Sequence, residues 1–221
     1  MLKSFLFELA TLFAIINPYG LAFVFLHRTM GLSDRERSGV AKQVAIYAFC
    51  VLIVSSLAGT LILGFFGISI PALRIAGGLV VGAAGWNLLN EAPLNDEAHA
   101  SSSQSADAIR AQAFFPLTVP LTTGPGTIAT AITLAASRDL SHGWNQGWII
   151  PLLSTLTASF IVAVAIFHAY AHVSRMARIL GPEGTSVIMR LSAFLLLCVG
   201  VQIIINGVTG ITIPGLQPPA R

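Results

Sequence analysis

Apolar residues occur along the chain in long stretches that are separated by short polar segments. The stretches are residues 4–26, 44–66, 70–90, 113–136, 148–170 and 191–213. At a rise of 1.5 Å per residue, an apolar helix of about 20 residues spans the ~30 Å hydrocarbon core of a bilayer. The pattern therefore predicts an all-α membrane protein with six transmembrane helices.

The polar segment 91–112 lies between the third and fourth stretches. It is rich in serine, alanine and acidic residues and has too few apolar residues to form a core, which is typical of a linker. We therefore expect two three-helix units, residues 1–90 and 113–221. Because three is an odd number, the second unit enters the membrane from the opposite face, so any sequence repeat between the units implies inverted symmetry.

A weak repeat joins the third and sixth stretches. Arg74 and Asn90 flank the third stretch, and Arg190 and Asn206, each 116 positions later, flank most of the sixth. Taken alone the match is weak, because an arginine at a helix start often extends to the headgroups and an asparagine often ends a helix.

The first and fourth stretches strengthen the repeat, since proline and glycine interrupt both near the middle. The interruptions are Ile-Asn-Pro-Tyr-Gly at 16–20 and Thr-Thr-Gly-Pro-Gly at 122–126. Proline removes a backbone donor, and glycine permits the conformations that restart a helix. We expect helices 1 and 4 to be broken at mid-membrane, with Asn17 and Thr123 as N-caps. The alternative is a pair of ordinary proline kinks.

Two inverted breaks would bring two helix N-termini, with unpaired N–H groups and positive dipole ends, into one midplane cavity. Such a cavity suits a carboxylate, and nearby hydroxyls and amides would orient the solute. The predicted substrate-binding residues are Asn17, Pro18, Tyr19, Gly20, Thr122, Thr123, Gly124, Pro125, Gly126 and Thr127.

Other polar residues in the apolar stretches have two interpretations each. Glu8, about one turn inside the first helix, either extends to the interface or carries a coupling proton. Asn87 and Gln202 either line the cavity or form interhelical hydrogen bonds. His168 and His172 have the spacing of metal ligands but lack a third ligand, so we expect an interfacial role.

A small-residue face in the third stretch predicts close helix packing. It consists of Gly77, Gly78, Gly82 and Gly85.

Composition excludes most other classes of protein. Charged residues make up 10% of the chain against 55% hydrophobic residues, and the mean hydropathy is +0.80, which is too apolar for folding in water. The net charge of +3 comes from basic residues between the stretches, so we expect no nucleic-acid partner. No motif for a catalytic residue, cofactor or metal is present, and we do not expect an enzyme.

The basic residues also predict an orientation. Most of the 12 Lys and Arg residues lie between stretches one and two, three and four, and five and six. The positive-inside tendency places these segments in the cytoplasm and both termini outside it.

Three motifs together resemble the MarC family of bacterial and archaeal inner-membrane proteins. They are Asn17-Pro18-x-Gly20, the string Pro-Leu-Thr-Thr-Gly-Pro-Gly at 120–126, and Arg-Ile-Ala-Gly-Gly at 74–78. The resemblance covers essentially the whole chain and implies an inner-membrane location. Members related to the SnatA branch are described as transporters of small neutral amino acids such as glycine and alanine. The resemblance thus implies that 17–20 and 122–126 hold a carboxylate.

The leading hypothesis is a secondary transporter of a small zwitterion by alternating access, with a proton or sodium as a possible coupling cation. A membrane scaffold, in which the broken helices only shape a packing surface, is the alternative. A channel is a weaker alternative, because no ring of charged residues that could line a pore is evident.

Overall fold

The computed structural model describes residues 2–90, 106–136 and 149–211, and within them it contains helices and no strands. The elements are α1 (Leu2–Ile16), α2 (Pro18–Arg28), α3 (Asp34–Phe65), α4 (Ile70–Asn90), α5 (Ala106–Ala111), the π-helix η1 (Ala113–Thr122), α6 (Pro125–Ala136) and α7 (Ile149–Thr209). The predicted all-α class is confirmed.

Five segments of the described chain are long and apolar enough to cross a membrane. They are Phe5–Arg28, Asp34–Phe65, Ile70–Asn90, Leu152–Gly181 and Glu183–Thr209. The fourth predicted span is not among them, because it is divided into η1 and α6, a helix of 12 residues. The predicted first span is also divided, into α1 and α2, so both predicted breaks are present.

Helix α7 consists of two arms that meet at Gly181. The backbone there has φ 70° and ψ 176°, a conformation that residues with a Cβ rarely adopt. We call Leu152–Gly181 the first arm and Glu183–Thr209 the second arm.

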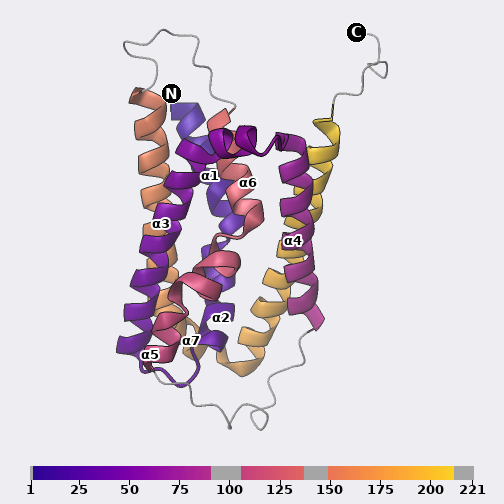
Figure 1. Cartoon of the computed structure of the whole chain (residues 1–221). Coiled ribbons are helices and arrows are strands. Elements are labelled where there is room, and N and C mark those ends of the chain that lie inside the picture. The colour runs from indigo at the N-terminus through magenta and orange to yellow at the C-terminus, as the bar shows by residue number, and fades with distance from the viewer. Residues whose placement is uncertain (1, 91–105, 137–148, 212–221) are drawn as a thin grey trace.

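The ends of the helices group at the two ends of the bundle (Figure 1). The start of α1, the end of α6 and both outer ends of α7 lie at one end. The turn between α2 and α3, the end of α4, the start of α5 and the turn of α7 lie at the other, which we call the basic end. The pair η1 and α6 runs in the direction opposite to that of α1 and α2 (Figure 1).

Helix α3 begins earlier than the apolar pattern predicts. A capping box starts it, in which Ser33 Oγ accepts from the Glu36 N–H at 3.4 Å and Glu36 Oε2 accepts from the Ser33 N–H at 3.0 Å. The basic residues that we predicted in a loop, such as Arg37 and Lys42, therefore lie on a helix.

The predicted linker is partly outside the described residues, which omit 91–105. Its last part is more ordered than its composition predicts, since 106–111 form α5 and Ile109 is buried.

The glycine face of α4 packs directly on backbone, as predicted. A Cβ on Gly78 would lie 2.7 Å from the Gly200 carbonyl oxygen, and one on Gly85 would lie 2.6 Å from the Leu197 nitrogen. The outer surface is apolar, with Leu61 at 75% and Leu79 at 59% exposed. Such side chains suit contact with lipid.

Candidate binding site at two helix breaks

Asn17 forms the first break. Its backbone lies in the left-handed region (φ 43°, ψ 61°), which asparagine tolerates better than most residues. Its Oδ1 accepts from the Gly20 N–H at 3.3 Å, and Pro18 occupies the first helical position, where a missing N–H leaves no bond unmade. The predicted cap is confirmed, and α2 begins in the interior of the bundle (Figure 1).

Gly20 brings the first break against the second arm of α7. A Cβ at this position would lie 2.6 Å from Ser192 Oγ and would clash with the side-chain amide of Asn17. Ser192 is buried, and sequence reasoning did not single it out. Position 20 therefore admits only a residue without a side chain.

Helix η1 leads to the second break. The residues before its two prolines, Phe115 and Val119, are extended, as expected from the clash between a proline ring and the preceding residue. Backbone bonds run five residues back, for example from the Thr123 N–H to the Thr118 carbonyl at 2.8 Å. The Phe-Pro and Val-Pro pairs were the sequence signal for this irregularity.

Threonine hydroxyls complete the hydrogen bonding of η1. The hydroxyls of Thr118 and Thr122 each donate to the carbonyl five residues earlier at 2.7 Å, and that of Thr123 donates to the Thr118 carbonyl at 3.2 Å. All three threonines are buried. These side chains thus add hydroxyl donors to carbonyls of η1, and the Thr118 carbonyl accepts from both the N–H and the hydroxyl of Thr123.

The prediction that Thr123 caps the second half-helix is wrong. Its hydroxyl points back into η1, whereas the Gly124 carbonyl accepts the first helical bond of α6, from the Ile128 N–H at 3.1 Å. Gly124 is the cap residue, and Pro125 follows at the first helical position. The N–H groups at the start of α6 therefore have no threonine cap.

The start of α6 rests on the glycine face of α4. A Cβ on Gly77 would lie 3.0 Å from the Pro125 carbonyl oxygen, and one on Gly126 would clash with Val81. Thr127, in the first turn of α6, is buried. The second break is thus enclosed by another helix, as the first is by Ser192.

A tyrosine that sequence reasoning missed links the end of η1, at the second break, to α2. The hydroxyl of Tyr170, on the first arm, lies 2.9 Å from that of Thr122. Its ring stacks on Phe25 of α2 with the centroids 4.4 Å apart. Tyr170 is fully buried, and a polar aromatic residue inside an apolar stretch was the available signal.

The structure does not bring Tyr19 to the second break. Its side chain is 39% exposed, and its hydroxyl lies 3.3 Å from His168 Nδ1. The histidine ring packs edge-on against the tyrosine ring, and His172 Nδ1 lies 2.9 Å from the His168 carbonyl oxygen. These residues form an exposed group beside the first break.

Glu8 does not extend into solvent, since it is only 6% exposed. Its carboxylate accepts hydrogen bonds from Thr155 Oγ1 at 3.0 Å and from Ser154 Oγ at 3.2 Å, both on the first arm of α7. One turn further along that arm, the buried Ser159 hydroxyl has no partner among the described residues. A buried acid and an available hydroxyl thus lie on the helices that flank the first break.

Asn87 and Gln202 lie away from the enclosed breaks. Both are exposed, and Gln202 Nε2 donates at 3.0 Å to Asn206 Oδ1 of its own helix. The structure therefore supports neither cavity lining nor interhelical bonding for Gln202.

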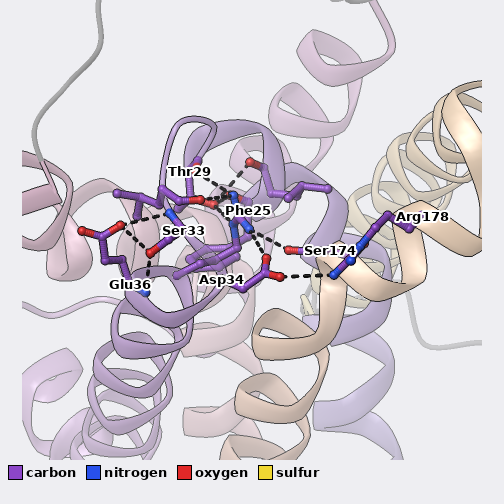
Figure 2. Close-up of polar contacts among 10 residues, drawn as sticks. Phe25, Thr29, Ser33, Asp34, Glu36, Ser174 and Arg178 are labelled. Atoms are coloured by element: carbon purple, nitrogen blue, oxygen red, sulfur yellow. Dashed lines mark hydrogen bonds and ion pairs between the residues drawn. The ribbon is translucent and has the colours of Figure 1, made fainter.

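At the basic end, Arg37 joins the two halves of the chain through Ser174. Figure 2 shows Asp34, Ser174 and Arg178 of this group. The guanidinium of Arg37 donates to Thr29 Oγ1, the Thr29 and Leu32 carbonyls, Asp34 Oδ1 and Ser174 Oγ, the last at 2.6 Å. Asp34 Oδ2 also accepts from Arg178 at 3.1 Å. These bonds tie the turn between α2 and α3 to the first arm of α7.

Comparisons with known proteins agree on one family. Residues 2–212 match the family described as "MarC family integral membrane protein". The chain is 36% identical over 213 residues to "UPF0056 inner membrane protein MarC" of Citrobacter koseri, covering 94% of this chain and 95% of that one. Similar proteins of the same name occur in Escherichia coli O6:H1 and Salmonella typhimurium, each at 36% identity over 94% of this chain and 95% of the relative. No solved structure matches.

Proposed function

The chain belongs to the MarC family of integral membrane proteins, and on that premise we propose that it is a secondary transporter of small neutral amino acids across the inner membrane. The observation that carries the proposal is the pair of enclosed helix starts, at Pro18 and Pro125. Broken helices at corresponding places of two halves are the best sequence and structural pointer to a transporter site.

We infer that the two halves are inverted repeats. Helix α1 contacts α6 and α2 contacts η1, which is the crossed pairing that two antiparallel broken helices produce. The packing is also reciprocal. The first break contacts Ser192 in the second arm of α7, and the second break contacts Gly77 in α4. Ser192 follows Arg190, and Gly77 follows Arg74, by a similar number of residues.

The chemistry of the breaks favours a small zwitterion. Helix N-termini offer N–H donors and a positive dipole to a carboxylate, without requiring a charged side chain. The space around them is restricted, because Gly20, Gly77 and Gly126 all meet neighbouring atoms closely. A solute with a short side chain, such as glycine or alanine, fits this setting better than a large one.

Alternating access requires that contacts between the halves break at one end while they form at the other. At the basic end Arg37 and Asp34 hold the first arm of α7. Near the opposite end Glu8 contacts the same arm through Thr155. A buried acid at such a contact is suited to couple cation binding to the movement, and we assign Glu8 this role, with a proton or sodium as the cation.

We further propose that the basic end faces the cytoplasm and that both termini lie outside it. Arg35, Arg37, Arg175 and Arg178 all lie near that end, in agreement with the positive-inside tendency. Fusions at the C-terminus test this orientation. An active phosphatase and an inactive fluorescent protein are expected there, and the reverse result would invert the assignment.

Counterflow in proteoliposomes tests the transport proposal. Vesicles loaded with unlabelled glycine or alanine are expected to accumulate labelled glycine, whereas vesicles loaded with glycinamide, which lacks the carboxylate, are not. Equal exchange with the amide would remove the helix N-termini from the site. No exchange with any solute of a broad panel, by protein that is correctly inserted, would favour the membrane scaffold instead.

A further inference from the structure

A cavity of about 300 Å³ lies on the outside of the basic end, between the first turns of α3 and the first arm of α7. Its lining includes Arg35 and Ser38 from α3, and His172, Ser174 and Arg175 from α7. The cavity lies at the basic end, although His172 also belongs to the exposed group beside the first break, and Asp34 and Ser174 also take part in the basic-end contact between the halves.

The charge around the cavity is strongly positive. Arg35 and Arg175 line the cavity together with Asp34, and the guanidinium groups of Arg37 and Arg178 pair with the Asp34 carboxylate. Both oxygens of that carboxylate are engaged, one by Arg37 at 3.0 Å and the other by Arg178 at 3.1 Å (Figure 2). Arg37, Arg178 and Arg175 share the single negative charge of Asp34, so a net positive charge remains at the cavity.

Arg35 and Arg175 form no ion pair or hydrogen bond with any residue that the structure describes. They approach the same hollow from two different helices, with the hydroxyl of Ser38 beside them. Guanidinium groups bind phosphate oxygens through paired N–H donors, and hydroxyls add further donors. This arrangement is suited to a phosphate group.

An apolar surface begins at the edge of the cavity and continues towards the middle of the bundle. Phe167 lines the cavity and is 36% exposed, and Val164 and Phe160, further along the same arm, are 49% and 61% exposed. Phe160 meets Phe49 of α3 edge-on, with centroids 6.5 Å apart. At 1.5 Å per residue, Phe160 lies about 10 Å below Phe167, within the reach of an acyl chain.

We propose that this cavity binds the phosphate headgroup of an anionic phospholipid, with one acyl chain against Phe167 and Phe160. A basic hollow directly above exposed aromatic side chains matches the amphipathic form of a lipid, and basic pockets at the cytoplasmic side of membrane helices are suited to such headgroups. A soluble phosphate would use the same arginines but would gain nothing from the apolar surface. The binding would hold α3 and α7 together at the basic end.

Thermal unfolding of the full chain in neutral detergent tests the proposal. Phosphatidylglycerol is expected to raise the unfolding temperature more than phosphatidylcholine does. Arg35→Gln/Arg175→Gln is expected to raise the half-saturating concentration of phosphatidylglycerol by about tenfold or more, because it removes two positive charges that attract the anionic headgroup. Arg28→Gln/Arg190→Gln removes the same charge from exposed positions outside the cavity and should respond as the wild type does.

A third measurement distinguishes a lipid headgroup from free phosphate as the ligand. Inorganic phosphate at millimolar concentration is expected to give no shift, and a shift equal to that with phosphatidylglycerol would overturn the lipid assignment. An unchanged lipid response in Arg35→Gln/Arg175→Gln, or an equal loss in Arg28→Gln/Arg190→Gln, would overturn the site itself. Phe160→Ser adds a readout of the apolar part, and it should weaken the response to the lipid.

Discussion

The hydroxyl of Thr122 lies 2.9 Å from that of Tyr170, and the direction of this hydrogen bond follows from a third atom. Thr122 Oγ1 donates to the Leu117 carbonyl at 2.7 Å, so its only proton is already used. Tyr170 is therefore the donor to Thr122. Because the ring of Tyr170 also stacks on Phe25, this side chain holds the end of η1 against α2.

Tyr170→Phe removes this donor while keeping the ring. Since the lost bond is buried, we expect the free energy of unfolding in detergent to fall by about 1 kcal/mol. Tyr47→Phe is the matched control, because Tyr47 is 37% exposed and its hydroxyl forms no hydrogen bond within the described chain. Equal effects of the two substitutions would contradict the assigned bond.

The contact between α4 and the second arm predicts a difference between two glycines. A Cβ on Gly200 would clash with the backbone of Gly82, whereas a Cβ on Gly82 meets only Leu197 Cδ1, at 3.8 Å. We expect Gly200→Ala to reduce stability by about 1–3 kcal/mol, as overpacking does, and Gly82→Ala to have little effect. Thermal unfolding of both variants measures this. A tolerated Gly200→Ala would mean that the helices lie further apart.

The sequence was sufficient to predict the helix starts that a single proline determines. It was not sufficient to predict side-chain contacts that depend on residues distant in the chain. Pro18 and Pro125 fix the first helical positions after each break, because proline lacks the donor and has a fixed φ. Thr123 looked like a cap for α6, but both its N–H and its hydroxyl donate to the Thr118 carbonyl, so Thr123 ends η1 instead. Likewise the burial of Glu8 depends on Thr155, which is 147 residues away in the chain.

Two substitutions test the role of Asn17, and Thr123→Ala serves as a comparison. Asn17→Gly keeps the left-handed backbone and loses the cap, so we expect stability to fall by only a few tenths of a kcal/mol. Asn17→Asp keeps the acceptor for Gly20 but places a negative charge at the proposed carboxylate site, so glycine binding should fall at least tenfold. Thr123→Ala should reduce stability with little effect on binding. Calorimetric titration with glycine compares them, and unchanged affinity in Asn17→Asp would exclude a carboxylate at this break.

Arg37→Lys keeps the positive charge at the basic end but loses the planar fork of donors. The guanidinium makes five hydrogen bonds, and an ammonium can make at most three. Because most of these acceptors are buried or half-buried, we expect the free energy of unfolding to fall by about 2 kcal/mol. Arg190→Lys, at an exposed position, is the control, and a similar loss there would show that arginine content rather than the Arg37 contacts matters.

Glu8→Gln separates a coupling role from a packing role. The amide oxygen still accepts from Thr155, so the contact between α1 and α7 is largely kept while the charge is removed. We expect the variant to exchange glycine in counterflow as the wild type does, but to lose gradient-driven accumulation, because a neutral amide neither binds a cation by charge nor releases a proton. Thr155→Val is the counterpart, since it removes a hydrogen bond and leaves the carboxylate; it should keep gradient-driven accumulation. If Glu8→Gln accumulates glycine normally, the carboxylate only joins the two helices, and coupling resides elsewhere.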